Sequence, residues 1–245
     1  LMTQQNYFDQ RKVADPERDK IVESLYPLRA HIDADVRRCI ATMIGMLRRA
    51  TDPARKTLDA LLGDRDPSVL AVAIWASGNL GTGASTLVRT LLNHVAHQDR
   101  EVRLRVPWAL GEIRVFDRPV KSALLKLARD PEETVRLFAF EAIGACAPNV
   151  DADLIDIVRS GLTDQKVPSR VGACSVVWGV AGDWSSVRKD LENLFANGQP
   201  GERAQAALAI CHCWPDVVKR PEINQWLHEN QGYWWAVDLL AGKKV

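Results

Sequence analysis

The stretch Asp66-Pro67-Ser68-Val69, which is followed by Gly78, decides the fold because its pattern recurs along the chain. Its valine and its glycine both return every 33 residues, and an Asp or Glu stands three residues before each valine. Four copies align: Asp33, Val36 and Gly45; Asp66, Val69 and Gly78; Asp99, Val102 and Gly111; Glu132, Val135 and Gly144. Two independent features, the valine and the glycine, that keep the same period over four copies indicate a repeat protein.

An arginine directly after the valine position extends the period toward the C-terminus. It stands at Arg37, Arg103, Arg136, Arg170 and Arg203, and the last two steps are 34 and 33 residues. The segments between the copies carry apolar residues at helical spacing and are separated by turn signals. No alternating β-branched stretch competes with this pattern. The sequence therefore predicts an all-α chain of about seven helical pairs.

The motif itself resembles the HEAT repeat. An Asp-Pro-x-Val-Arg pattern with a glycine nine residues after the valine, which Asp66 to Gly78 follows except for Leu70 in place of the arginine, is closest to the short bacterial kind known from phycobilin lyase subunits. The resemblance covers about residues 18–242 and implies a right-handed α-solenoid whose second helices line the concave side. We expect a polar tail or cap at 1–17, a single repeat domain at 18–242 and a short tail at 243–245.

The composition excludes several classes of protein. With 47% hydrophobic residues the chain is globular, and 32 Lys and Arg against 31 Asp and Glu give a charge of +1. That balance argues against a general positive field for nucleic acid, and no apolar run is long enough to span a membrane. The five scattered cysteines favour free thiols and a cytoplasmic location. Cys211-His212-Cys213 lacks a second ligand pair, so we expect no metal and no cofactor.

Helical geometry sorts the second helix of each repeat into two faces. If the repeat valine is position 0, positions 0, 4, 7, 8 and 11 share one arc and are expected to form the core. In the first copy they are Val36, Ile40, Met43, Ile44 and Leu47.

Position 6 points away from that core. It is occupied by Thr42, Trp75, Trp108 and Glu141. Tryptophan is enriched at binding hot spots, so we predict a partner-binding surface made of Trp75, Trp108, Arg105, Glu112, Asn79, Thr42 and Glu141. The alternative is that the two tryptophans only fill space between neighbouring helices.

The charged columns have a structural interpretation. We expect a hydrogen-bonded ladder between repeats, formed by Asp33, Asp66, Asp99, Arg37, Arg103, Arg136, Arg170 and Arg203. Asp52, Asp66 and Asp130 each precede a proline and are predicted N-caps. Pro27 and Pro107 lie within helical patterns and are expected to kink them.

The other tryptophans carry less information. Trp178 lies on an apolar stretch and is expected in the core, whereas Trp184 and Trp214 flank turns. The C-terminal group of Trp226, Trp234 and Trp235 either seals the last repeat or forms an exposed patch for a partner or a second copy.

Three catalytic precedents with similar folds find little support. A hydroxylase-type di-iron site needs several His-Glu pairs, and the chain has one, His228-Glu229. Resemblance to alkylpurine DNA glycosylases implies tryptophans and an acid against DNA, here Trp234 and Asp238 or Trp108 and Glu112. Resemblance to phycobilin lyase subunits implies a tetrapyrrole on a carrier protein.

We therefore predict a non-enzymatic scaffold or adaptor that binds another protein, such as an assembly factor, a chaperone-like subunit or an immunity protein. A glycosylase-like or lyase-like enzyme is the alternative.

Overall fold

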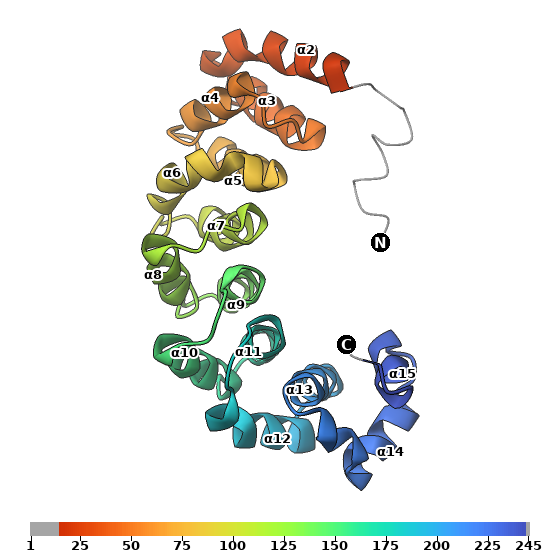
Figure 1. Ribbon diagram of the computed structural model, residues 1–245. Helices are drawn as coiled ribbons and strands as arrows, with labels where there is room; N and C mark the ends of the chain where they lie inside the picture. Colours follow the sequence, from red (N-terminus) through yellow and green to blue (C-terminus); the bar gives the residue numbers. More distant parts are fainter. Residues whose placement is uncertain (1–14, 244–245) are drawn as a thin grey trace. The chain divides into compact units, whose positions relative to one another are not determined.

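A computed structural model describes residues 15–243 of the chain, and in that range every regular element is helical. The chain divides into two compact units with the boundary between Leu127 and Ala128; we call them unit 1 and unit 2. Along the sequence the α-helices follow one another as seven pairs, from α2 and α3 to α14 and α15 (Figure 1). The prediction of an all-α solenoid with about seven helical pairs is confirmed.

Unit 1 consists of two layers of helices (Figure 1). The second helices α3, α5 and α7 pack side by side in one layer, and α4, α6 and α8 form the other. The elements in chain order are α2 (Asp15–Leu25), η1 (Tyr26–Ala30), α3 (Ala34–Leu47), α4 (Asp52–Leu61), α5 (Pro67–Asn79), η2 (Gly81–Leu87), α6 (Val88–Leu92), α7 (Arg100–Ile113) and α8 (Arg118–Leu127).

Unit 2 repeats the same construction with α9, α11 and α13 as neighbouring second helices. Phe140 and Ile143 of α9 and Ile210 of α13 are buried in its core. Its elements are α9 (Glu133–Cys146), α10 (Ala152–Leu162), α11 (Val167–Gly179), η3 (Ser185–Val187), α12 (Arg188–Asn197), α13 (Pro200–Cys213), η4 (Pro215–Lys219), α14 (Pro221–Glu229) and α15 (Trp234–Leu240).

The acidic column caps helices, and the hydrogen bonds of its carboxylates lie within one repeat. Asp33, Asp66 and Asp99 are the N-caps of α3, α5 and α7, and each accepts a backbone N–H of its own helix at 2.8 Å. A carboxylate at an N-cap satisfies a backbone donor that the helix leaves unpaired. The prediction that these three aspartates form the inter-repeat ladder is wrong, because their side chains are used locally.

Two of the predicted N-caps are displaced by one or two residues. Thr51 caps α4, and Asp52 is the first residue of that helix. Glu132 occupies the N-cap position of α9, and Asp130 instead accepts the Glu132 N–H at 3.0 Å. The prediction holds for Asp66 alone.

The arginine column does bridge repeats, with acids that the sequence analysis did not single out. Arg37 donates to both carboxylate oxygens of Asp64, 27 residues later, at 2.6 and 2.9 Å. These bonds lower the pKa of Asp64 below its ordinary value, because they stabilise the charged carboxylate. The guanidinium also donates to the carbonyl oxygens of His31 and Ile32, which precede its own helix.

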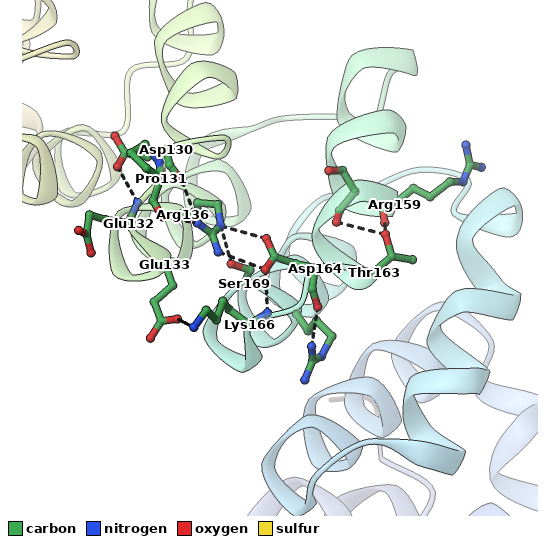
Figure 2. A network of polar contacts seen from close by, with 12 residues as sticks. Asp130, Pro131, Glu132, Glu133, Arg136, Arg159, Thr163, Asp164, Lys166 and Ser169 are labelled. Atoms are coloured by element: carbon green, nitrogen blue, oxygen red, sulfur yellow. Dashed lines mark hydrogen bonds and ion pairs between the residues drawn. The ribbon is translucent and has the colours of Figure 1, made fainter.

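In unit 2 the arginine bridges also reach residues at position 0 of the next repeat, and Figure 2 shows Arg136 between Asp164 and Ser169. Arg136 donates to Ser169 Oγ at 2.8 Å and lies 3.0 Å from the Asp164 carboxylate. Arg170 pairs with Glu202, which is 1% exposed. A buried carboxylate is stable only when charged or polar partners replace its water.

Two further arginines of the column donate to carbonyl oxygens close to them in sequence. Arg203 donates to the Phe195 carbonyl oxygen at 2.9 Å, which joins α13 to α12 of the same pair. Arg103 donates to the carbonyl oxygens of His97 and Gln98 at 2.9 and 3.0 Å.

The prolines shape their helices differently. Pro27 does not kink a long helix; α2 ends at Leu25 and a separate 3-10 helix carries the proline near its start. Pro107 lies inside α7, which continues to Ile113.

The predicted boundaries are partly covered by the described residues. Helix α2 begins at Asp15, so residues 15–17 are helical, whereas the rest of the predicted N-terminal tail and residues 244–245 lie outside the described range. All five cysteines are free thiols. Within residues 15–243, no helix combines the length and the apolar character that crossing a membrane requires.

Candidate functional site

A groove of about 540 Å³ crosses the exposed side of the second helices of unit 1. Thr42, Trp75 and Arg105, which the sequence analysis predicted as partner-binding residues, all line it. The complete lining is Arg38, Thr42 and Met46 from α3, Ser68, Ala71, Val72 and Trp75 from α5, and Glu101 and Arg105 from α7. We call this the unit 1 groove. Residues from three successive repeats thus form one continuous surface.

Trp75 packs against the preceding repeat and also lines the unit 1 groove. A Cβ atom built on Gly45 would lie 2.6 Å from the edge of its indole ring, so the ring packs directly on the glycine of the preceding repeat. Trp108 is placed in the same way on Gly78, at 2.5 Å. The recurring glycine (Gly45, Gly78) thus leaves space for the side chain at position 6 of the next repeat. The edge of each indole ring therefore fills space between neighbouring helices, as the alternative interpretation expects.

Both tryptophans are nevertheless only partly buried. Trp75 contributes its remaining surface to the unit 1 groove. An aromatic ring that is fixed by packing and open on its other side binds a partner with little loss of rotamer entropy.

The charged residues of the groove differ in whether another group of the protein stabilises their charge. Arg38 pairs with Asp35 of its own helix at 2.9 Å. Glu101 lies in the first turn of α7, where the helix dipole stabilises an acid. Arg105 is partly buried, and among the described residues its side chain makes no hydrogen bond, ion pair or ring contact.

The other predicted partner-binding residues lie outside the lining. Asn79 donates to the Trp75 carbonyl oxygen at 3.1 Å, which occupies its amide within the helix. Glu112 is exposed near the end of α7. Glu141 belongs to unit 2, where desolvation by neighbouring protein atoms raises the pKa of its carboxyl even though the residue is exposed.

Several lining residues were missed by the sequence analysis. Arg38, Ser68, Ala71, Val72 and Glu101 occupy positions 2, −1, 2, 3 and −1 of their repeats. These positions flank position 6 on the side away from the core, so the helical wheel could have found them.

Met43 corrects the predicted core. It is 41% exposed, although Ala76 and Ala109 at the same repeat position are fully buried. Position 7 packs on the glycine of the preceding repeat, as Ala76 does on Gly45. Helix α3 has no preceding second helix among the described residues, so Met43 stays uncovered.

The tryptophans of unit 2 divide into buried and exposed residues. Trp178 is 42% exposed, so its predicted place in the core is wrong. Trp184 is fully buried, and its indole N–H donates to the Val180 carbonyl oxygen at 2.9 Å. Trp226 and Trp235 stack at 6.0 Å in the last pair, while Trp234 is 71% exposed.

Two further cavities lie in unit 2. One of about 300 Å³ is polar and is lined by Asp164, Arg170 and Glu202, which are already occupied by the arginine bridges. The other, about 640 Å³, is mainly apolar and lies between α13, η4 and the end of α15. Within the described part of the chain, no three His, Cys, Asp or Glu side chains gather in a way that could hold a metal ion.

Burial makes three of the cysteines of unit 2 poor nucleophiles. It raises the pKa of Cys174 and of Cys211 to about 12. The pKa of Cys213 is raised to about 11. Thiols with such pKa values are protonated at neutral pH and unreactive.

Comparison with known proteins agrees with the repeat class. Residues 59–144 match the family model described as HEAT repeats. This segment therefore resembles HEAT repeats, as the 33-residue period predicts, whereas nothing supports the phycobilin lyase type. A search of curated proteins finds no match.

Solved structures with the same fold include engineered and natural repeat proteins. An engineered protein has 18% identity and a TM-score of 0.62, over 76% of this chain and 93% of that one. A designed armadillo repeat protein in complex with the peptide (KR)4 has 16% identity and a TM-score of 0.59, over 77% and 98%. The HEAT-like repeats protein of the archaeon Thermococcus onnurineus NA1 has 16% identity and a TM-score of 0.57, over 78% and 86%. At these identities the likeness concerns the fold alone.

Proposed function

We propose that the protein is a non-catalytic scaffold that binds another protein through the unit 1 groove. The observation that carries the proposal is the groove itself, in which Trp75 is held by Gly45 on one side and open on the other. A preformed surface on packed helices loses little conformational entropy when a partner binds. The peptide complex of the designed armadillo protein supports the proposal by showing that this fold can present a peptide-binding surface.

The chemistry of the described residues favours binding over catalysis. The groove contains one acid, two arginines, two hydroxyl groups and apolar side chains, but no histidine or cysteine. No pair within it has the arrangement of a nucleophile and its base. The proposal is therefore a binding role, as an adaptor, a chaperone-like subunit or an immunity protein.

The test uses a substitution that fills the groove and leaves the core intact. Val72 is partly buried and lines the groove, so Val72→Glu should place a charge on the binding surface. The wild-type protein and this variant are used as bait in an extract of the native cells. We expect the variant to lose partners that the wild type retains.

A matched control separates a surface effect from misfolding. Val167→Glu introduces the same change at a 40% exposed valine of unit 2. It should recover the wild-type partners, and both variants should keep the wild-type circular dichroism spectrum. Equal recovery by wild type and Val72→Glu would contradict the proposed function.

We also propose self-association through the last repeat. Trp234 is 71% and Val237 46% exposed on α15, a large apolar surface for the end of one short helix. Sedimentation velocity of the wild type and of Trp234→Ser over a range of concentrations tests it. A wild-type protein that stays monomeric throughout contradicts it. The cytoplasmic location stays a prediction.

A further inference from the structure

Arg105 indicates which chemistry the partner brings to the unit 1 groove. The residue is partly buried, and its side chain has no hydrogen-bonding, ionic or ring partner among the described residues. A carboxylate that binds an unpaired guanidinium gains charge-assisted hydrogen bonds. The residue is therefore poised to accept an anionic group from outside.

The other charges of the groove do not compete for this role. The Arg38 charge is already paired with Asp35, and Glu101 is exposed and stabilised by the N-terminus of its helix. Glu101 lies one helical turn before Arg105 but does not pair with it, although the spacing would permit a pair. Arg105 is thus the cation of the lining that a partner can neutralise.

Glu101 also limits the charge of the group that binds. A phosphate carries nearly two negative charges at neutral pH and would be repelled by the neighbouring carboxylate. A single carboxylate is repelled less and still forms two parallel bonds with a guanidinium. This favours an acidic side chain over a phosphorylated one and over a nucleic-acid backbone.

The neighbouring helix supplies the apolar part of the site. Val72 and Trp75 of α5 and Met46 of α3 line the same groove, and Met46 is exposed. Methionine and tryptophan adapt well to apolar side chains of a partner. An acidic residue of the partner that contacts Arg105 on α7 would therefore lie next to an apolar residue of the partner that contacts Val72 and Trp75 on α5.

We infer that the unit 1 groove binds a protein segment in which Asp or Glu lies within a few residues of a large apolar side chain, with Arg105 holding the carboxylate. This inference rests on the proposed function and makes it specific. It sets the chain apart from the designed armadillo protein that was solved with the basic peptide (KR)4.

Selection from a random peptide library displayed on phage tests the inference directly, because it requires no identified partner. Peptides selected on the full-length wild type should be enriched in Asp or Glu close to Leu, Phe or Trp. Selection on Arg105→Glu should replace the acid in the enriched pattern with Lys or Arg, because the charge of the site is reversed. The peptide (KR)4 should not bind the wild type.

Affinities of one selected peptide complete the test, measured by fluorescence anisotropy. Arg105→Ala should weaken binding about tenfold, the effect of one charge-assisted hydrogen-bonded pair. Arg89→Ala removes an exposed arginine from the other helix layer of unit 1 and should leave the affinity unchanged.

The outcomes separate this inference from the proposed function. Peptides that lose binding in Val72→Glu but contain no acid, or that bind Arg105→Ala as well as the wild type, overturn the inference and leave the proposed function standing. Selection that yields no peptide sensitive to Val72→Glu overturns both.

Discussion

The two units follow one repeat but separate their second helices by different means. In α5 and α7 of unit 1 position 6 is tryptophan, and each indole edge rests on a glycine of the preceding repeat. In α11 of unit 2 the equivalent residue is Ser175, whose carbonyl oxygen would lie 3.0 Å from a Cβ on Gly144. Large spacers in unit 1 leave an aromatic groove, whereas small residues in unit 2 bring α9 and α11 into backbone contact. The repeat specifies the fold, and position 6 determines the surface.

Position 0 changes within unit 2. Val69 and Val102 of unit 1 and Val135 of unit 2 are buried and apolar, whereas Ser169 and Glu202 in the following repeats of unit 2 are buried and polar and accept hydrogen bonds from the arginine of the preceding repeat. Unit 2 therefore adds bonds through its interior, whereas both units make an edge bridge to the following turn, Arg37 with Asp64 in unit 1 and Arg136 with Asp164 in unit 2. The following predictions test this contrast.

The largest effect is expected at Glu202. Glu202→Ala leaves Arg170 without its carboxylate and also removes the capping bond to the Gln199 N–H. Removing one partner of a buried ion pair lowers the free energy of unfolding by about 3–5 kcal/mol. Urea unfolding measures it. Glu192→Ala, which removes a more exposed glutamate of the same unit, should cost less than about 1 kcal/mol. Equal losses for the two variants would contradict the interior bridge.

The next effect tests the aromatic spacer of unit 1. Trp75→Ala should cost about 3 kcal/mol because it leaves a cavity above Gly45. Ser175→Ala at the equivalent position of unit 2 should cost less than about 1 kcal/mol. Similar losses in the free energy of unfolding for Trp75→Ala and Ser175→Ala would show that the two residues do not differ in how they separate neighbouring second helices.

A double-mutant cycle sharpens the same comparison. Gly45→Ala should destabilise the wild type by about 1–2 kcal/mol, because the new methyl group meets the rigid indole. In the Trp75→Ala background the same change should cost less, since the indole is gone and the close neighbour that remains is Ala76, whose Cα lies 3.0 Å from the new Cβ. Additive effects in urea unfolding would show that ring and glycine are not in contact.

Gly179 probes the close approach in unit 2. A Cβ there would lie 2.6 Å from the Gly144 carbonyl oxygen, and backbone cannot move aside as a side chain can. Gly179→Ala should therefore cost about 1–3 kcal/mol. Gly201→Ala, where nothing lies within 4 Å, is the control and should cost almost nothing.

The smallest expected effect concerns pH. Arg37 lowers the pKa of Asp64 in the folded state, so the pair contributes stability above the unfolded pKa of about 3.9. That contribution is lost as the pH falls through the folded pKa. Asp64→Asn should thus lose more stability at pH 7 than at pH 3, whereas the fully exposed Asp216→Asn should show no such difference. Equal losses at both pH values would contradict the bridge.

The sequence was sufficient for the fold because the period fixes where every helix pair begins. It was sufficient for part of the site, since Trp75, Thr42 and Arg105 share a helical face that any regular helix would present. It could not identify the partners of the arginines, because Asp64 and Asp164 lie in turns whose geometry depends on the folded repeats. Trp178 was misplaced for a related reason: it stands where the earlier repeats carry glycine, and a large ring cannot enter that helix contact.

The central claim is that a partner protein lies in the unit 1 groove. Site-specific photo-crosslinking tests it most directly, with benzoylphenylalanine introduced at Val72 and, as a control, at Arg89 of α6. In cells that express the protein, position 72 should give a discrete crosslinked partner that Arg105→Glu abolishes, and position 89 should give none. Crosslinks from position 89 alone, or crosslinks from position 72 that Arg105→Glu leaves unchanged, would contradict the account.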